Sequence, residues 1–198
     1  SGANDYYNVA LGSGLFNQTG PNGSQPTSYF SIDYGNWVIL GLDSAYNATS
    51  MYMDGVINDP YQPAFMAQAS AGKNVIVLTH HNPIDTVGQN KNALWNDVTG
   101  ANALNAEPQM WYWGHIHNGI VYSNESVCGS TTKGRCIGNG SIPIGNAQWL
   151  ENQSTVDFYT NAPLNDGTPN NALRVKSGFC ILTITNGVIS EAWYDEDG

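Results

Sequence analysis

The sequence predicts an α/β fold with mixed strand pairing in a layered sheet arrangement. Two observations support this class: strand-length apolar runs alternate with helix-length segments in the middle of the chain, and two strand-like runs near its end are separated by Asn186-Gly187. Alternating strands and helices are typical of a sheet covered by helices. An Asn-Gly pair favours a tight hairpin, because a type I′ turn needs two positive φ angles.

Local composition predicts each element. Segments rich in Gly, Asn, Pro, Ser and Thr indicate loops, and short apolar runs indicate strands. In chain order we expect a loop at 12–27, strands at 28–33 and 37–43, a helix near 60–71 opened by proline, a strand at 74–79, a helix near 91–106, a strand ending at Trp113, an irregular region at 138–171, and strands at 179–185 and 188–194. No repeat or charge block divides the 198 residues, so residues 1–198 are expected to form one domain.

All four histidines follow predicted strands. His80 and His81 directly follow one apolar run, and His115 and His117 follow the next, after an aromatic run and a glycine. A lone histidine is more often a hydrogen-bonded residue than a metal ligand. Four of them at two strand ends favour a metal site, because imidazole is the commonest metal ligand and strand ends in α/β sheets usually present such ligands.

These motifs resemble those of the calcineurin-like metallophosphoesterases. Gly114 to His117 is similar to the family's Gly-His-x-His, and Val75 to His80 is similar to the strand and histidine that precede it. The tail, from Gly178 to Asp197, resembles the closing hairpin, and Tyr29 to Ser44 resembles an earlier strand pair. The resemblance therefore covers nearly the whole chain.

The resemblance implies a fold, a site and an activity. The fold would be a β-sandwich flanked by helices, of which this chain supplies the second half, as the C-terminal part of the domain. The ligands would be His80, His115 and His117, with His81 pointing off the sheet although it is a further candidate. The activity would be hydrolysis of phosphate esters by metal-bound hydroxide, with Zn, Fe or Mn as the divalent metal.

The early metal-binding motifs of the family are missing. No Asp-x-His and no Gly-Asp precede the histidines, and the start of the chain resembles the Gly-Asn-His region with Ala3 in place of the asparagine and Asn4 in place of the histidine. A shift of one residue would make Asn4 a ligand. Two cations about 3.5–4 Å apart need anionic ligands, whereas three imidazoles suffice for one ion with an open position. We therefore expect one ion or none, and an isolated chain without activity.

Two functions remain open. The chain is either the C-terminal portion of a secreted metal-dependent phosphoesterase that acts only with its other half, or a non-enzymatic extracellular glycoprotein, such as a self-assembling or filament subunit. A start within a family motif suggests a cut polypeptide or a split gene. A half-sandwich exposes an apolar face and an unpaired edge, so we expect a missing N-terminal half or a homo-oligomer as partner, bound through strands 28–43 and 179–194.

Composition indicates the compartment and excludes some partners. Six Lys and Arg against sixteen Asp and Glu give a net charge of −10, which argues against nucleic acid. No apolar run is long enough for a membrane span. With only 11% of residues charged, the surface is typical of an extracellular protein. Six sequons are candidate glycosylation sites: Asn17, Asn22, Asn47, Asn124, Asn139 and Asn152.

Several further residues are weaker candidates. Cys128 and Cys136 flank a polar loop that a disulfide could close, whereas Cys180 is expected to be a buried thiol. Asp85 and Asn118 lie close enough in sequence to the histidines to join the site. The remaining candidates are expected to be solvated, capping or surface groups: Asp54, Asp59, Asp97, Lys133 and Arg135.

Overall fold

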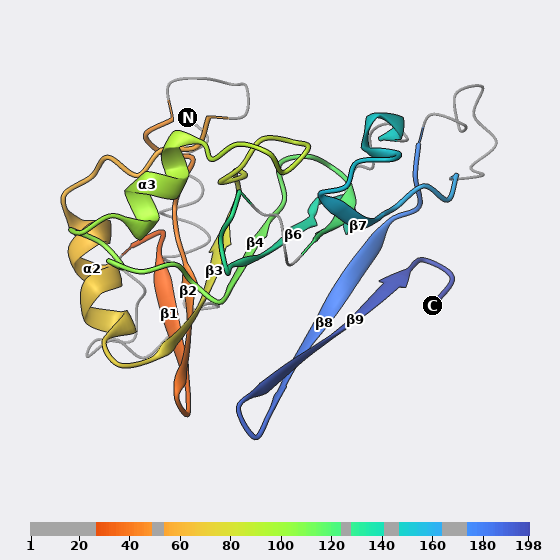
Figure 1. Cartoon of the computed structure of the whole chain (residues 1–198). Coiled ribbons are helices and arrows are strands. Elements are labelled where there is room, and N and C mark those ends of the chain that lie inside the picture. The colour runs from red at the N-terminus through yellow and green to blue at the C-terminus, as the bar shows by residue number, and fades with distance from the viewer. Residues whose placement is uncertain (1–26, 49–53, 124–127, 141–146, 164–173) are drawn as a thin grey trace.

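The computed structural model describes residues 27–48, 54–123, 128–140, 147–163 and 174–198 (Figure 1). Within these residues, seven strands form one mixed sheet in the order β1-β2-β3-β4-β6-β5-β7, and β8 pairs with β9 in a separate hairpin. The elements are β1 (Phe30–Tyr34), β2 (Trp37–Gly41), α2 (Tyr61–Ser70), β3 (Asn74–Thr79), α3 (Ala93–Thr99), β4 (Met110–Trp113), β5 (Gly119–Tyr122), β6 (Lys133–Ile137), the 3-10 turns η2 (Gly138–Gly140) and η3 (Gln148–Leu150), β7 (Val156–Tyr159), β8 (Gly178–Thr185) and β9 (Val188–Asp195).

The centre of the large sheet is parallel. Strands β2, β3, β4 and β6 run side by side in one direction, so their carboxyl ends lie along one edge. The strands β1, β5 and β7 are joined to the sheet by antiparallel pairing. Parallel strands are normally covered on both faces, which accounts for the unbroken apolar runs of β3 and β4.

Alternate residues of the central strands pack on two layers. Val77 and Trp111 face α2 and α3, while Ile76 and Tyr112 face the β8–β9 hairpin. Figure 1 shows the two helices on one side of the sheet and the hairpin on the other. The sheet is thus the middle layer of three.

A buried ion pair joins the hairpin to the sheet. Nε of Arg135, on β6, donates to both carboxylate oxygens of Glu191, on β9, at 3.1 and 2.9 Å. The Tyr112 hydroxyl donates to the same carboxylate at 2.7 Å. Arg135 is only 4% exposed, so the expectation that it lies at the surface is wrong.

The structure confirms the α/β class, the mixed pairing and the terminal hairpin. Asn186 and Gly187 both have positive φ, 53° and 79°, as the expected turn requires. The second helix is shorter than expected, because it ends at Thr99, before Gly100, and turns occupy the residues that follow. The region expected to be irregular, 138–171, contains β7.

The expected Cys128–Cys136 disulfide is absent, and both thiols are free. Strand β6 begins at Lys133, and it places the Cys136 side chain in the helix-facing core. The Cys128 thiol instead donates to the Gly88 carbonyl at 3.6 Å. Cys180 is half-buried against the sheet and is also free.

The sequons differ in accessibility. Asn152 is exposed in a turn and Asn47 is half-buried in another. Asn139 is buried, and its amide donates to the Thr160 hydroxyl and to the Lys176 carbonyl. Its side chain is therefore not accessible for glycosylation in this structure. The other three, Asn17, Asn22 and Asn124, lie outside the described residues. In the described part of the chain, no helix is long and apolar enough to cross a bilayer.

Candidate metal centre

The histidines meet at the carboxyl edge of the parallel strands. Thr79, the last residue of β3, pairs with Trp113, the last residue of β4, so the residues that follow the two strands are neighbours. The His80 carbonyl accepts the backbone N–H groups of Gly114 and His115, at 3.1 and 2.9 Å. These bonds fix the two connecting loops to each other at the place where the side chains meet.

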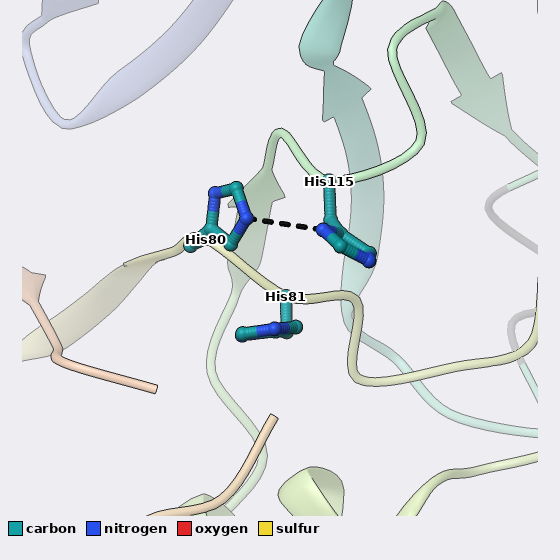
Figure 2. A group of neighbouring side chains, drawn as sticks. All are labelled: His80, His81 and His115. Atoms are coloured by element: carbon teal, nitrogen blue, oxygen red, sulfur yellow. Dashed lines mark hydrogen bonds between the residues drawn. The ribbon is translucent and has the colours of Figure 1, made fainter. Parts of the chain in front are cut away.

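Three imidazoles form a compact group, shown in Figure 2: His80, His81 and His115. One candidate ligand atom from each lies within 4.8 Å of the others. Nδ1 of His115 is 3.0 Å from Nε2 of His80. Nitrogens around one tetrahedral zinc ion are about 3.3 Å apart, because each Zn–N bond is about 2.0–2.1 Å long. The His80 and His115 nitrogens are already close to that spacing. The two ligand atoms that lie farthest apart would need side-chain rotation to reach it.

His81 belongs to this group, so the expectation that it points off the sheet is wrong. It is 5% exposed, and its Nδ1 lies 3.1 Å from the hydroxyl of Ser44, which follows β2. The same hydroxyl accepts the His81 backbone N–H at 3.2 Å. A Cβ added at Gly55 would come within 2.4 Å of the His81 Cβ, so the absence of a side chain there makes room for this placement.

Ser44 sets the orientation of the His81 ring. In the tautomer that donates Nδ1–H to the hydroxyl, Nε2 carries the lone pair that a metal ion needs. Partners of this kind commonly orient metal-binding histidines and raise their basicity. No local sequence pattern marks Ser44 as a site residue, although its position just beyond the strand next to β3 places it at the same sheet edge.

The surroundings keep the imidazoles neutral. Burial lowers the pKa of His80, and a charge on His117 would lower it further. Burial, followed by the neighbouring His80 and His115, lowers the pKa of His81 to about 4, against smaller opposing effects of the hydrogen bond with Ser44 and of the Asp54 charge. Burial, followed by the neighbouring His80 and His117, lowers the pKa of His115. Neutral imidazole is the form that binds a metal, so the group is ready to act as a ligand set at neutral pH.

His117 lies beside the group and is not one of its three members. Its Nδ1 is buried and has no hydrogen-bond partner among the described residues, and the same holds for Oδ1 of Asn118. The loop is tightly packed, since a Cβ at Gly138 would come within 1.9 Å of the Gly114 carbonyl oxygen. The structure therefore brings His80 and His115 together as expected, with His81 as the third ring.

The carboxylates considered as extra ligands have other roles. Asp85 accepts from Gln89 and Asn90 in its own loop, and Asp59 caps the start of α2. Asp97 accepts the Ile57 N–H. Asp54 is exposed and acts on His81 only through its charge. Among the remaining candidates, Lys133 is exposed at the surface and Asn4 lies outside the described residues.

No protein-family model, curated protein sequence or solved structure matches this chain.

Proposed function

We propose that the chain is the metal-binding, C-terminal portion of a secreted metal-dependent phosphoesterase, holding one divalent ion through His80, His81 and His115. The observation that carries this proposal is the meeting of three neutral imidazoles at the ends of two adjacent parallel strands. Zinc, iron and manganese are the candidate ions. The low charge content and the exposed sequon at Asn152 support an extracellular setting.

The bound ion would polarise a phosphoryl oxygen and activate water for attack on phosphorus. The residues of this chain would bind the ion and orient the three imidazoles. Ser44 fixes the His81 ring, and the His80 carbonyl ties the two histidine loops together. The layered arrangement, with helices and a hairpin on opposite faces of the sheet, supports the resemblance to a metallophosphoesterase sandwich.

The proposed activity of the isolated chain is low. The group of three contains no carboxylate, and a two-metal site needs anionic ligands to offset repulsion between the ions. We propose that a second polypeptide, or residues outside the described ones, supplies them. The isolated chain should therefore bind a metal but hydrolyse phosphate esters little better than the free ion does.

A non-enzymatic assembling glycoprotein is the second candidate. One observation favours it: the outward face of the hairpin carries no charged side chain and exposes Phe179, Ile181 and Val188. Such a face suits contact between like chains, which would otherwise repel each other through their net charge of −10.

Zinc titration by calorimetry, followed by a phosphatase assay, tests the proposal. We expect one zinc ion per chain in the wild type and loss of stoichiometric binding in His115→Ala. Gln89→Ala, an exposed loop change, serves as the control and should bind like the wild type. Zinc binding that is unchanged in His115→Ala would refute the site. Clear ester turnover by the wild-type chain that is lost in His115→Ala would refute the proposed low activity.

A further inference from the structure

A pocket with an aromatic wall opens next to the histidine group. It has a volume of about 350 Å³ and is lined by His115, Ile116, His117, Asn118 and Trp149. Trp149 belongs to η3, more than thirty residues beyond the histidine loop in sequence, and is 50% exposed. Large side chains are usually buried, so a half-exposed indole on a pocket wall is available for contact with a ligand.

The indole face is open to a ligand. In the described part of the chain no ring or cation stacks on Trp149, whereas Trp95 stacks on Trp111 and is covered by Lys91. In the described part of the chain, the hydrogen bond of Trp149 is made by its backbone, whose carbonyl accepts from the Gln153 amide. Its side chain therefore carries no bond that a ligand would have to break.

His115 is shared by the pocket and by the proposed metal site. It lines the pocket that Trp149 lines, and its Nδ1 contacts His80. A molecule that reaches the histidine group from this side can place a polar head near the imidazoles while the rest of it lies against the indole. A flat apolar ring makes the most favourable contact with such a surface.

We propose that the site takes phosphate esters of ring-bearing alcohols, such as aryl or nucleoside esters, and that Trp149 stacks on the ring. This inference rests on the proposed phosphoesterase function and adds the substrate class. Trp149 is the residue that distinguishes ring-bearing from small aliphatic esters. An aromatic contact of this kind corresponds to a preference of roughly three- to tenfold.

Calorimetry with two phosphonates on the zinc-loaded full chain tests the substrate class. Phenylphosphonate and methylphosphonate have the same head and differ in the ring, and neither can be hydrolysed. We expect phenylphosphonate to bind roughly three- to tenfold more tightly. Trp149→Ala should remove this preference and leave methylphosphonate affinity unchanged, while Trp149→Phe should keep part of it. Tyr61→Ala, at a 70% exposed aromatic residue on α2, is the matched control.

Equal binding of the two phosphonates to the wild type, or a preference that survives in Trp149→Ala, would overturn the inference and leave the metal site intact. Failure of zinc to bind would refute the metal site instead. In that case, ring recognition is measured by the binding of phenol to the metal-free chain. A phenol-induced shift of the Trp149 indole N–H resonance supports the pocket, and no shift refutes it.

Discussion

At the scale of single residues, the contact between Ser44 and His81 completes the group of three histidines. Neither residue belongs to the three ligands that the motifs imply, yet their contact places a third imidazole beside His80 and His115. The contact is possible because β2 and β3 are parallel neighbours and end at the same edge. The composition of the histidine group is therefore defined by strand order as much as by the histidine motifs.

Removal of the Ser44 hydroxyl should weaken metal binding. Ser44→Ala leaves the His81 ring without its orienting partner, and loss of such a partner commonly lowers metal affinity by about 10- to 100-fold. Competition titration with a zinc indicator measures this change. Ser190→Ala, at an exposed position on β9, should leave the affinity unchanged. Equal affinities in the two variants would contradict the role of Ser44.

The stability of the metal-free chain should fall with acid. The pKa values of His80, His81 and His115 are lowered in the folded chain, so the unfolded chain binds more protons below the ordinary histidine pKa of about 6.5. Stability from these groups is complete above that pH and is lost as the pH falls towards the His81 value of about 4. Thermal unfolding at pH 7.5 and pH 5 measures the difference. His81→Asn should reduce the loss, and an equal loss would contradict the assignment.

At the scale of elements, a buried charge network joins the hairpin to the sheet. Arg135 of β6 and Glu191 of β9 pair where the sheet and the hairpin meet, with side chains 5% and 15% exposed. Glu191→Ala would remove the carboxylate that pairs with this buried guanidinium, and removing one partner of a buried ion pair typically costs about 3–5 kcal/mol. Urea unfolding measures this loss. Asp33→Ala breaks the exposed pair with Lys73 and should cost at most about 1 kcal/mol. Similar losses in both variants would contradict the importance of the buried network.

The sequence predicts the elements whose patterns are local. The apolar runs of β3 and β4 and the Asn186-Gly187 turn appear where expected. Strand β6 was missed because its Lys133 and Arg135 look like surface residues. The Arg135 guanidinium pairs with Glu191, more than fifty residues further along the chain, and no local pattern reveals such a contact.

The candidate site was predictable only in part, for the same reason. His80 and His115 follow adjacent apolar runs, and the parallel pairing of such runs brings their ends together. The place of His81 depends on Ser44 and on the close packing of Gly55, and both contacts join distant segments. The loop geometry that sets His117 beside the group also depends on a remote residue, Gly138.

At the scale of the whole molecule, the hairpin exposes an apolar face. In the described residues β8 and β9 pair only with each other, and their outward face exposes Ile181 at 46% and Val188 at 69%. We expect association through this face, either with a second copy or with a chain that completes the sandwich. Burial of this exposed apolar area in an interface would be favourable by about 25 cal/mol for each Å² removed from water.

A charge placed on the hairpin should prevent this association. Ile181→Lys adds a cation to an uncharged sheet face, so burial of the face would become costly. Sedimentation velocity at micromolar concentration should show the wild type as an oligomer or a complex and Ile181→Lys as a smaller species. Tyr61→Lys, on the opposite layer of the molecule, should behave like the wild type. A monomeric wild-type chain of 21.3 kDa would refute the prediction.

X-ray absorption at the zinc edge tests the central claim, the binding of one ion by His80, His81 and His115, most directly. The account predicts about three imidazole nitrogens at about 2.0–2.1 Å from zinc, and a loss of imidazole scattering in His80→Ala and His115→Ala. A zinc ion surrounded by oxygen alone, or a spectrum unchanged by these substitutions, would contradict it.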